Sequence, residues 1–318
     1  MKKRLVAPVK QVEKIAAAFA LPPLSIQRAA NTLISPIFFL DTTHVIKARP
    51  ATLENESSIH EEAALLEIIR SHLPFEVPYY LRSRSGALSL SEGGYLWTVH
   101  LMVPGKPIGN WYHTVEPSLA GNDIVMRTLR TIHQSTKHLD VTRWLRPHSS
   151  TVAAKRIIQR EPRWLTMSDR RHIEAAIQRA EAKCTTIKQG GDSVVLHGDL
   201  HQGNILANSS GDVTGVIDWH GARGGHFCDD VGFTIMMLSR DFSSWSPTPS
   251  TKQFHELTRA YGASSTEIRL IWDFTLIWAL LDAESFRRRS FPGATRYLKY
   301  QRAFCKALLD IPYQPSFP

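Results

Sequence analysis

A predicted strand, loop and hairpin between residues 194 and 218 constrain the fold of this chain more than any other stretch. The apolar run 194–196 predicts a short buried strand, which ends where Gly198 allows the backbone to turn. Asp199 follows on the loop. A carboxylate in this position can accept a proton from a hydroxyl group, so the loop is a candidate for general base chemistry.

Two predicted strands follow the loop, over residues 204–207 and 213–217, and the residues between them are rich in turn formers. A hairpin centred on Gly211 would place Asn204 beside Asp218, because each lies seven residues from that centre. Magnesium prefers hard oxygen ligands and takes few of them from protein. An amide oxygen and a carboxylate at one end of this ribbon therefore predict a Mg²⁺ site next to the loop carboxylate, as phosphoryl transfer requires.

Residues 197–204, with Ile-Asp-Trp at 217–219, resemble the motif of the aminoglycoside phosphotransferase family, a group that also holds choline, fructosamine and macrolide kinases. The resemblance implies a mixed α and β, two-lobed protein-kinase-like fold, with a small β-rich lobe and a larger, mainly helical one. It also implies that Asp199 is the catalytic base and that Asn204 and Asp218 bind Mg²⁺.

A less complete match follows the motif. Residues 225–232 resemble the family's Gly-Asp-Pro-x-x-Asp-Leu-Ala, although the usual Asp-Pro is replaced. This resemblance places Asp230 as a buried carboxylate that braces the catalytic loop, with His197 as a second structural support. His133, which ends an apolar-periodic segment, is also expected to be structural.

The nucleotide side of the site is expected in the first hundred residues. The predicted strand 43–48 carries Lys47, which resembles the phosphate-binding strand lysine of kinases. A helix predicted over residues 59–71 opens with two acidic residues. We expect Glu62 to pair with Lys47, with Glu61 as the alternative one residue away.

An aromatic strand predicted over residues 95–103 ends at Pro-Gly and resembles the hinge between the lobes. In the family the nucleobase contacts backbone groups of such a segment, which would here be those of Leu101 and Val103. The phosphate-covering loop is expected over residues 31–39, around Ser35, without the glycines that protein kinases use there.

Length and composition are typical of a folded enzyme. With 318 residues and 43% hydrophobic content, the chain can bury two cores. We expect a nucleotide-binding lobe over residues 1–103, with a leading amphipathic helix, and a catalytic and acceptor-binding lobe over 104–318. Three scattered cysteines show neither metal spacing nor a disulfide framework, and no apolar run is long enough to span a membrane, so a cytoplasmic protein is predicted.

The net charge of +9 at pH 7 does not by itself predict a nucleic-acid partner. No RNA-binding motif, zinc spacing or aromatic-basic platform accompanies it, and a basic total affects association and solubility more than fold. The sequence indicates neither a membrane partner nor an obligate protein partner.

An acidic stretch over residues 226–285, with eight Asp and Glu against four Lys and Arg, lies where the family builds its acceptor pocket. Carboxylates there would suit a cationic acceptor, and tryptophans could stack on a sugar ring or a cation. The candidate acceptor-binding residues are Asp229, Trp272, Asp273, Trp278 and Asp282. The alternative is that residues 271–281, apolar nearly all round, form a core helix. Residues 286–308, by contrast, carry seven basic residues and no acidic one.

The resemblance implies an O-phosphotransferase that moves the γ-phosphoryl group of ATP or GTP to a small molecule, with Mg²⁺ as cofactor. The first expectation is an antibiotic acceptor such as an aminoglycoside or a macrolide, and hence a resistance enzyme. The alternatives are a metabolite kinase for a choline-like amino alcohol or a sugar, and a non-catalytic kinase-like nucleotide-binding protein. A protein kinase is disfavoured, because only eleven residues separate Asp218 from Asp230 and no Ala-Pro-Glu follows.

Overall fold

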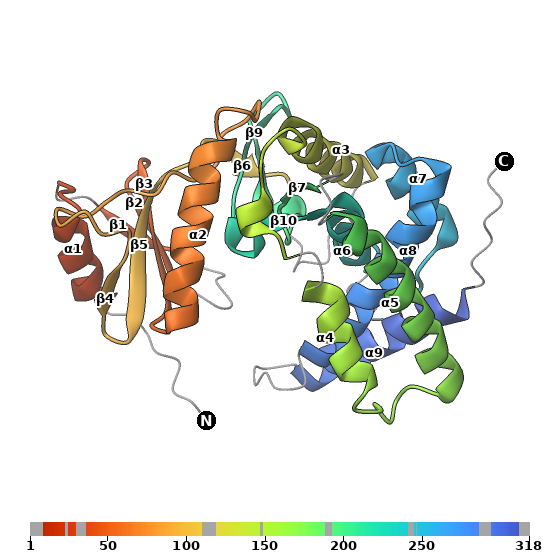
Figure 1. Cartoon of the computed structure of the whole chain (residues 1–318). Helices are drawn as coiled ribbons and strands as arrows, with labels where there is room; N and C mark the ends of the chain where they lie inside the picture. The colour runs from red at the N-terminus through yellow and green to blue at the C-terminus, as the bar shows by residue number, and fades with distance from the viewer. Residues whose placement is uncertain are drawn as a thin grey trace. The chain divides into compact units, whose positions relative to one another are not determined.

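In the computed structural model, the chain divides into two compact units. The N-terminal unit holds residues 1–106 and 206–220, and the C-terminal unit holds residues 107–205 and 221–318. The first is built on a β-sheet and the second is mainly helical (Figure 1). The residues that the structure describes are 9–22, 25–29, 36–109, 119–146, 149–187, 193–240, 245, 247–285 and 294–311.

A five-stranded antiparallel sheet in the order β1-β2-β3-β5-β4 forms the centre of the N-terminal unit. Its strands are β1 (Ile26–Arg28), β2 (Ile37–Leu40), β3 (His44–Pro50), β4 (Leu90–Glu92) and β5 (Tyr95–Leu101). One face buries Ile46 and Trp97 against Val12 and Ile15 of α1 (Val9–Ala18). Because side chains alternate along a strand, the residues between these core positions point to the other face.

The second face of the sheet carries polar side chains and meets α2 (Leu53–Ile69), so that the sheet lies between α1 and α2 (Figure 1). Helix α2 begins six residues before the predicted start at residue 59. Thr52 explains the earlier start, because its side chain accepts a hydrogen bond from the backbone N–H of Asn55 and so caps the helix.

The predicted hairpin after the Asp199 loop is present. A three-stranded sheet in the order β6-β8-β9 is formed by β6 (Lys106–Pro107), β8 (Ile205–Ala207) and β9 (Val213–Val216). The side chain of Asn208 accepts hydrogen bonds from the backbone of Ser210 and Asp212, and Gly211 has a φ of 87°. The turn chemistry expected from the sequence therefore closes this ribbon.

The C-terminal unit combines seven helices and a two-stranded sheet in the described ranges. Helix α8 packs against α4, α5, α6 and α9, and most of its side chains are buried, which confirms the alternative reading of residues 271–281 as a core helix. The helices are α3 (Leu119–Thr136), α4 (Ser149–Ile158), α5 (Met167–Ile187), α6 (Phe227–Leu238), α7 (Thr251–Tyr261), α8 (Ser265–Ser285) and α9 (Ala294–Asp310). The strands are β7 (Ser193–Leu196) and β10 (Arg223–His226), and short 3₁₀ turns are η1 (Thr142–Trp144), η2 (Gln202–Asn204) and η3 (Trp219–Gly221).

No helix in the described ranges combines the length and the apolar character that crossing a membrane would need.

Gly232 sets how closely α6 approaches α8. A Cβ at this position would lie 2.5 Å from the Cβ of Phe274 and 2.8 Å from the backbone nitrogen of Thr275. We expect Gly232→Ala to lower the free energy of unfolding by about 1–3 kcal/mol, because neither neighbour can rotate away. Urea unfolding followed by circular dichroism measures the change. An unaltered midpoint would show that the two helices tolerate a larger separation.

Candidate active site

A buried carboxylate holds the loop of residues 197–204, here called the Asp199 loop. Asp230, in the first turn of α6, accepts hydrogen bonds from the backbone N–H groups of His197 (2.7 Å) and Gly198 (2.9 Å). Gly198 has a φ of 79°, and a Cβ there would lie 2.4 Å from the carbonyl oxygen of Gly221. The loop therefore needs both the glycine and the carboxylate to keep its path.

Two further side chains extend the support of Asp230. His133 lies 3.2 Å from the Asp230 carboxylate through Nε2, and its Nδ1 lies 2.8 Å from the hydroxyl of Tyr261. The two ring nitrogens of His133 thus join the carboxylate to the tyrosine hydroxyl. Burial acts to raise the pKa of Asp230, but the hydrogen bond and charge of His133 outweigh it, and the pKa is lowered. Asp230 is thus ionised when it accepts the backbone bonds.

The Asp199 loop also orients its own polar side chains. The backbone N–H of Asp199 donates to Nδ1 of His197 (3.2 Å). The amide nitrogen of Asn204 donates to the backbone carbonyl of Asp199 (2.8 Å), which turns its amide oxygen the other way. That oxygen is the only atom of the Asn204 side chain suited to a hard cation.

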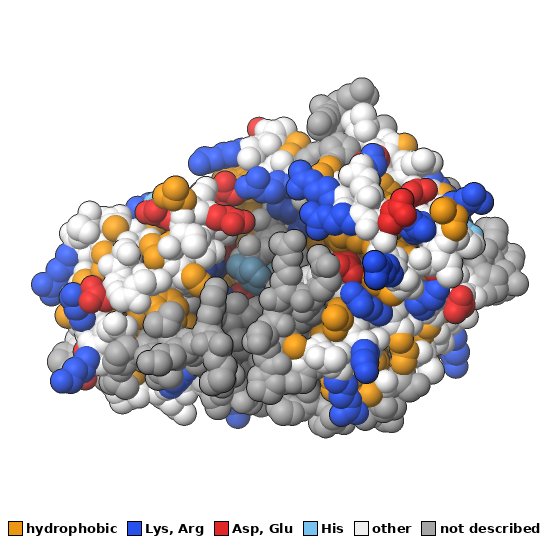
Figure 2. Space-filling view, turned by 90° about the horizontal axis from the view of Figure 1, so that it is seen from below, with side chains coloured by type: hydrophobic (Ala, Val, Ile, Leu, Met, Phe, Trp, Pro, Cys, Tyr) orange, Lys and Arg blue, Asp and Glu red, His pale blue; other side chains and the backbone are white. Residues whose placement is uncertain are grey.

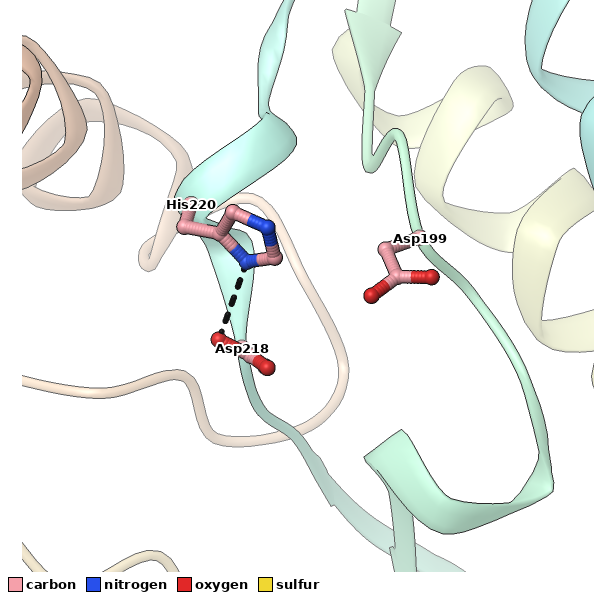
Figure 3. A group of neighbouring side chains, drawn as sticks. All are labelled: Asp199, Asp218 and His220. Carbon is pink, nitrogen blue, oxygen red and sulfur yellow. Dashed lines mark hydrogen bonds and ion pairs between the residues drawn. The ribbon is translucent and has the colours of Figure 1, made fainter. Parts of the chain in front are cut away.

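Asp218 lies in the N-terminal unit, where two basic groups contact it. Its carboxylate binds the ammonium of Lys47 at 2.5 Å. It also lies 3.1 Å from Nδ1 of His220 (Figure 3). Burial acts to raise the pKa of Asp218, but Lys47 and His220 outweigh it and hold the pKa well below its usual range. Asp218 also has a φ of 65°, a left-handed conformation that is costly for a residue with a Cβ. An ionised carboxylate in a strained backbone is typical of a functional position.

The predicted ion pair between Lys47 and Glu62 is wrong. Glu62 binds Arg49 instead, at 2.6 Å, with both side chains more than 90% buried. Lys47 and Arg49 are two residues apart on β3 and so share one face of the sheet, and the sequence alone did not show which of them meets α2. Glu61, the alternative partner, accepts a hydrogen bond from Ser57 at 3.4 Å.

His100 is a buried polar residue that the sequence analysis missed. It follows Val99 on β5 and lies 2.9 Å from the hydroxyl of Thr98. Its ring contacts that of Tyr80, with centroids 4.1 Å apart and planes tilted by 38°. Burial, together with the positive charges of Lys47 and Arg49, lowers the pKa of His100 to about 3. The imidazole is therefore neutral at physiological pH.

The predicted hinge residues differ in exposure. Leu101 is exposed, and its backbone N–H donates to the carbonyl of Tyr79 (3.0 Å), so this N–H is not free for a nucleobase. Val103 is buried. The predicted phosphate-loop residue Ser35 lies outside the described residues.

The predicted acceptor-binding residues are spread over the C-terminal unit, and their carboxylates are bound by arginines. Trp272 packs edge-on against Phe254, and Trp278 donates to Asp229 at 2.7 Å. The carboxylate pairs are Asp229 with Arg223 (2.8 Å), Asp273 with Arg179 (2.8 Å) and Asp282 with Arg240 (3.1 Å). The sequence did not show which arginine binds each carboxylate, because partners such as Arg179 and Asp273 lie far apart in the chain.

Comparison with known proteins adds to this geometry. A family model described as "Phosphotransferase enzyme family" matches residues 25–271 of the chain. No curated protein matches the sequence.

Several solved structures share the fold. The GDP and kanamycin complex of APH(2")-IIia is 14% identical, with a TM-score of 0.67, over 95% of this chain and 98% of that one. A microcompartment-associated aminopropanol kinase is 16% identical, with a TM-score of 0.64, over 94% and 95%. Macrolide 2'-phosphotransferase MphH from Brachybacterium faecium is 16% identical, with a TM-score of 0.57, over 96% and 98%. The predicted kinase-like fold is confirmed.

The depressed pKa of His100 makes stability depend on pH. The unfolded chain binds a proton near the ordinary histidine pKa of about 6.5, whereas the folded chain resists it down to about 3. The stabilisation is therefore complete above pH 6.5 and is lost as the pH falls towards 3.

When the pH falls from 7.5 to 5, we expect His100 to lower the free energy of unfolding by about 2 kcal/mol. His100→Gln should reduce the loss by that amount, measured by urea unfolding at the two pH values. His72→Gln, at an exposed histidine of the same unit, is the control. The same pH dependence in wild type and His100→Gln would show that His100 is not held neutral by the fold.

Proposed function

Because the chain belongs to the phosphotransferase enzyme family, we propose that it moves the γ-phosphoryl group of ATP or GTP to a hydroxyl group of a small molecule. The observation that carries this proposal is the Asp199 loop, whose backbone is held by the buried, ionised Asp230. Phosphoryl transfer is catalysed largely by holding the reacting groups in place, and a rigidly supported loop can hold a carboxylate in this way.

In the proposed reaction the acceptor hydroxyl oxygen forms a bond to the γ-phosphorus while the bond to the bridging oxygen of the nucleoside diphosphate breaks. Asp199 orients the hydroxyl and accepts its proton. The acceptor leaves as a phosphate ester and the nucleotide as its diphosphate.

We assign Asn204 and Asp218 as the Mg²⁺ ligands, on the spacing of the motif. Their chemistry fits the ion, since Asp218 is ionised and the Asn204 amide oxygen is turned away from its own loop. When bound, Mg²⁺ neutralises charge on the nucleotide phosphates. Lys47, which contacts Asp218 in the same unit, is assigned to the phosphates.

Two acceptor classes follow from the relatives. An antibiotic such as an aminoglycoside or a macrolide is supported by the similar GDP and kanamycin complex and by the macrolide 2'-phosphotransferase, and would make this a resistance enzyme. A metabolite such as an amino alcohol is supported by the aminopropanol kinase. A screen of aminoglycosides, macrolides, amino alcohols and sugars, read as release of nucleoside diphosphate, tests both.

Asp199→Ala should lower turnover by about 10²–10⁴-fold and leave the affinity for Mg²⁺-nucleotide nearly unchanged, because the residue acts on the acceptor. Asp218→Asn should lower turnover and also weaken the binding of Mg²⁺-nucleotide. Steady-state kinetics and nucleotide titration measure the two effects, with Asp212→Ala on the exposed turn of the same ribbon as control. A loss below about tenfold in Asp199→Ala would remove it as the base. Nucleotide binding without turnover on any acceptor would instead favour a non-catalytic binding protein.

Lys47→Ala should raise the KM for the nucleotide and slow transfer, since it removes the ammonium assigned to the phosphates. Lys10→Ala, at an exposed lysine of α1, should do neither. Equal effects from both replacements would mean that the assay responds to bulk positive charge and that Lys47 has no specific role.

A further inference from the structure

The acidic stretch over residues 226–285 leaves little free negative charge for a cationic acceptor. Seven of its eight acidic residues lie in the described ranges, and each has a partner there. The partners are Arg223 for Asp229, His133 for Asp230, Lys252 for Glu256, the backbone of Ser264 for Glu267, Arg179 and Arg269 for Asp273, Arg240 for Asp282, and Arg302 for Glu284.

Burial separates two of these carboxylates from any ligand. The side chains of Asp229 and Asp273 are 5% and 1% exposed, and each is bound by a guanidinium. A cation could bind Asp229 only by displacing Arg223, which would leave a buried guanidinium without its partner, and could bind Asp273 only by displacing Arg179. The electrostatic basis for a polycationic acceptor is therefore absent at these positions.

A pocket near Asp273 shows the same balance of charge. It has a volume of about 380 Å³, and its wall contains Arg179, Lys183 and Arg269 together with the acidic Asp273 and Glu267. Positive groups outnumber negative ones even in the pocket that contains a predicted acceptor residue.

The net charge of the protein resides almost entirely in the C-terminal unit. This unit has 26 Lys and Arg and 18 Asp and Glu, a net charge of +8, whereas the N-terminal unit has 12 and 11. On the face drawn in Figure 2, blue Lys and Arg side chains outweigh the red Asp and Glu side chains among those described. Such a field attracts anions and repels a compound with several ammonium groups.

Arg240 connects this positive field to the Asp199 loop. It is buried just after α6, where it donates to the hydroxyl of Tyr297 on α9 at 2.9 Å. Burial acts to lower the pKa of Arg240, but acidic groups that include Asp282 and Asp199 outweigh it and raise the pKa. Asp199 is thus one of the acidic groups whose charge acts on Arg240, and the hydrogen bond to Tyr297 joins the same guanidinium to α9.

The N-terminal half of α9 presents cations without acidic partners. Arg296 and Lys299 are exposed, and neither has a carboxylate partner among the described residues. The guanidinium of Arg296 stacks over Trp245, 4.3 Å from the ring centroid, and Trp245 meets Tyr300 edge-on. Stacking uses the flat face of the guanidinium and leaves its N–H groups free to bind a carboxylate.

We propose that the acceptor is an anionic alcohol, such as a sugar acid or a hydroxy acid, whose carboxylate binds Arg296 while its hydroxyl reaches Asp199. This inference rests on the proposed phosphotransfer and names its substrate class. The N–H groups of Arg296 supply the paired donors that a carboxylate requires, and stacking on Trp245 holds the guanidinium in place.

Two matched acceptor series test the charge directly. The first compares glucuronate, glucose and glucosamine, and the second compares glycerate, glycerol and 1-amino-2-propanol. We expect the anionic member of at least one series to have the highest kcat/KM, and its KM to rise with added salt because ions screen the attraction. Higher kcat/KM for the amine in both series would overturn the proposal while still demonstrating phosphotransfer.

Arg296→Gln tests the assigned contact. It should raise the KM for the anionic acceptor at least fivefold and leave the KM for the neutral parent and for ATP unchanged. Arg259→Gln, at an exposed arginine on α7, is the matched control and should change none of them. Equal effects of Arg296→Gln on anionic and neutral acceptors would contradict the assignment.

Equilibrium binding separates this inference from the proposed function. Calorimetric titration of glucuronate, glucose and glucosamine in the presence of Mg²⁺-ADP needs no turnover. Preferential binding of glucuronate that Arg296→Gln abolishes would support the anionic site even if no acceptor were phosphorylated. Equal or weaker binding of glucuronate than of glucosamine, together with no preference for the anion in the glycerate series, would overturn the site.

Discussion

The hydrogen bonds from the Asp199 loop to Asp230 are the interaction on which the candidate site depends. A buried carboxylate is costly unless it is paired, and here two backbone N–H groups and His133 meet its oxygens. The same bonds fix a loop that Gly198 alone could not hold, because a glycine permits many conformations. Removing the carboxylate would leave buried donors unpaired and free the loop that presents Asp199.

Charge pairing in the N-terminal unit follows from the alternation of β3. Lys47 and Arg49 project from the same face of the sheet, and each binds a different acid, Asp218 and Glu62 respectively. This division leaves Arg49 to tie α2 to the sheet and gives Lys47 a contact at the carboxylate assigned to the metal. His100 stays neutral beside them because its burial, and then their positive charges, disfavour its protonated form.

Arginine pairing changes what the acidic stretch of the C-terminal unit can do. From composition alone, these carboxylates would be assigned to ligand binding. In the structure they form ion pairs with guanidinium groups such as that of the buried Arg240. The charged groups that remain available on the N-terminal half of α9 are positive. The charge of ligand that this unit can bind therefore depends on which of its side chains are already paired. The composition of a segment is a poor guide to that charge.

Local chemistry let the sequence alone determine the fold class, the hairpin about Gly211 and the choice of Asp199, Asn204 and Asp218 as candidates. Turn formers, apolar periodicity and the spacing of a motif all act within a few residues. Tertiary structure decided which charges meet. The partner of Lys47, the burial of His100 and the arginines that bind Asp273 and Asp282 depend on contacts between residues far apart in the chain. Periodicity places a side chain on a face, but only packing determines which group lies opposite it.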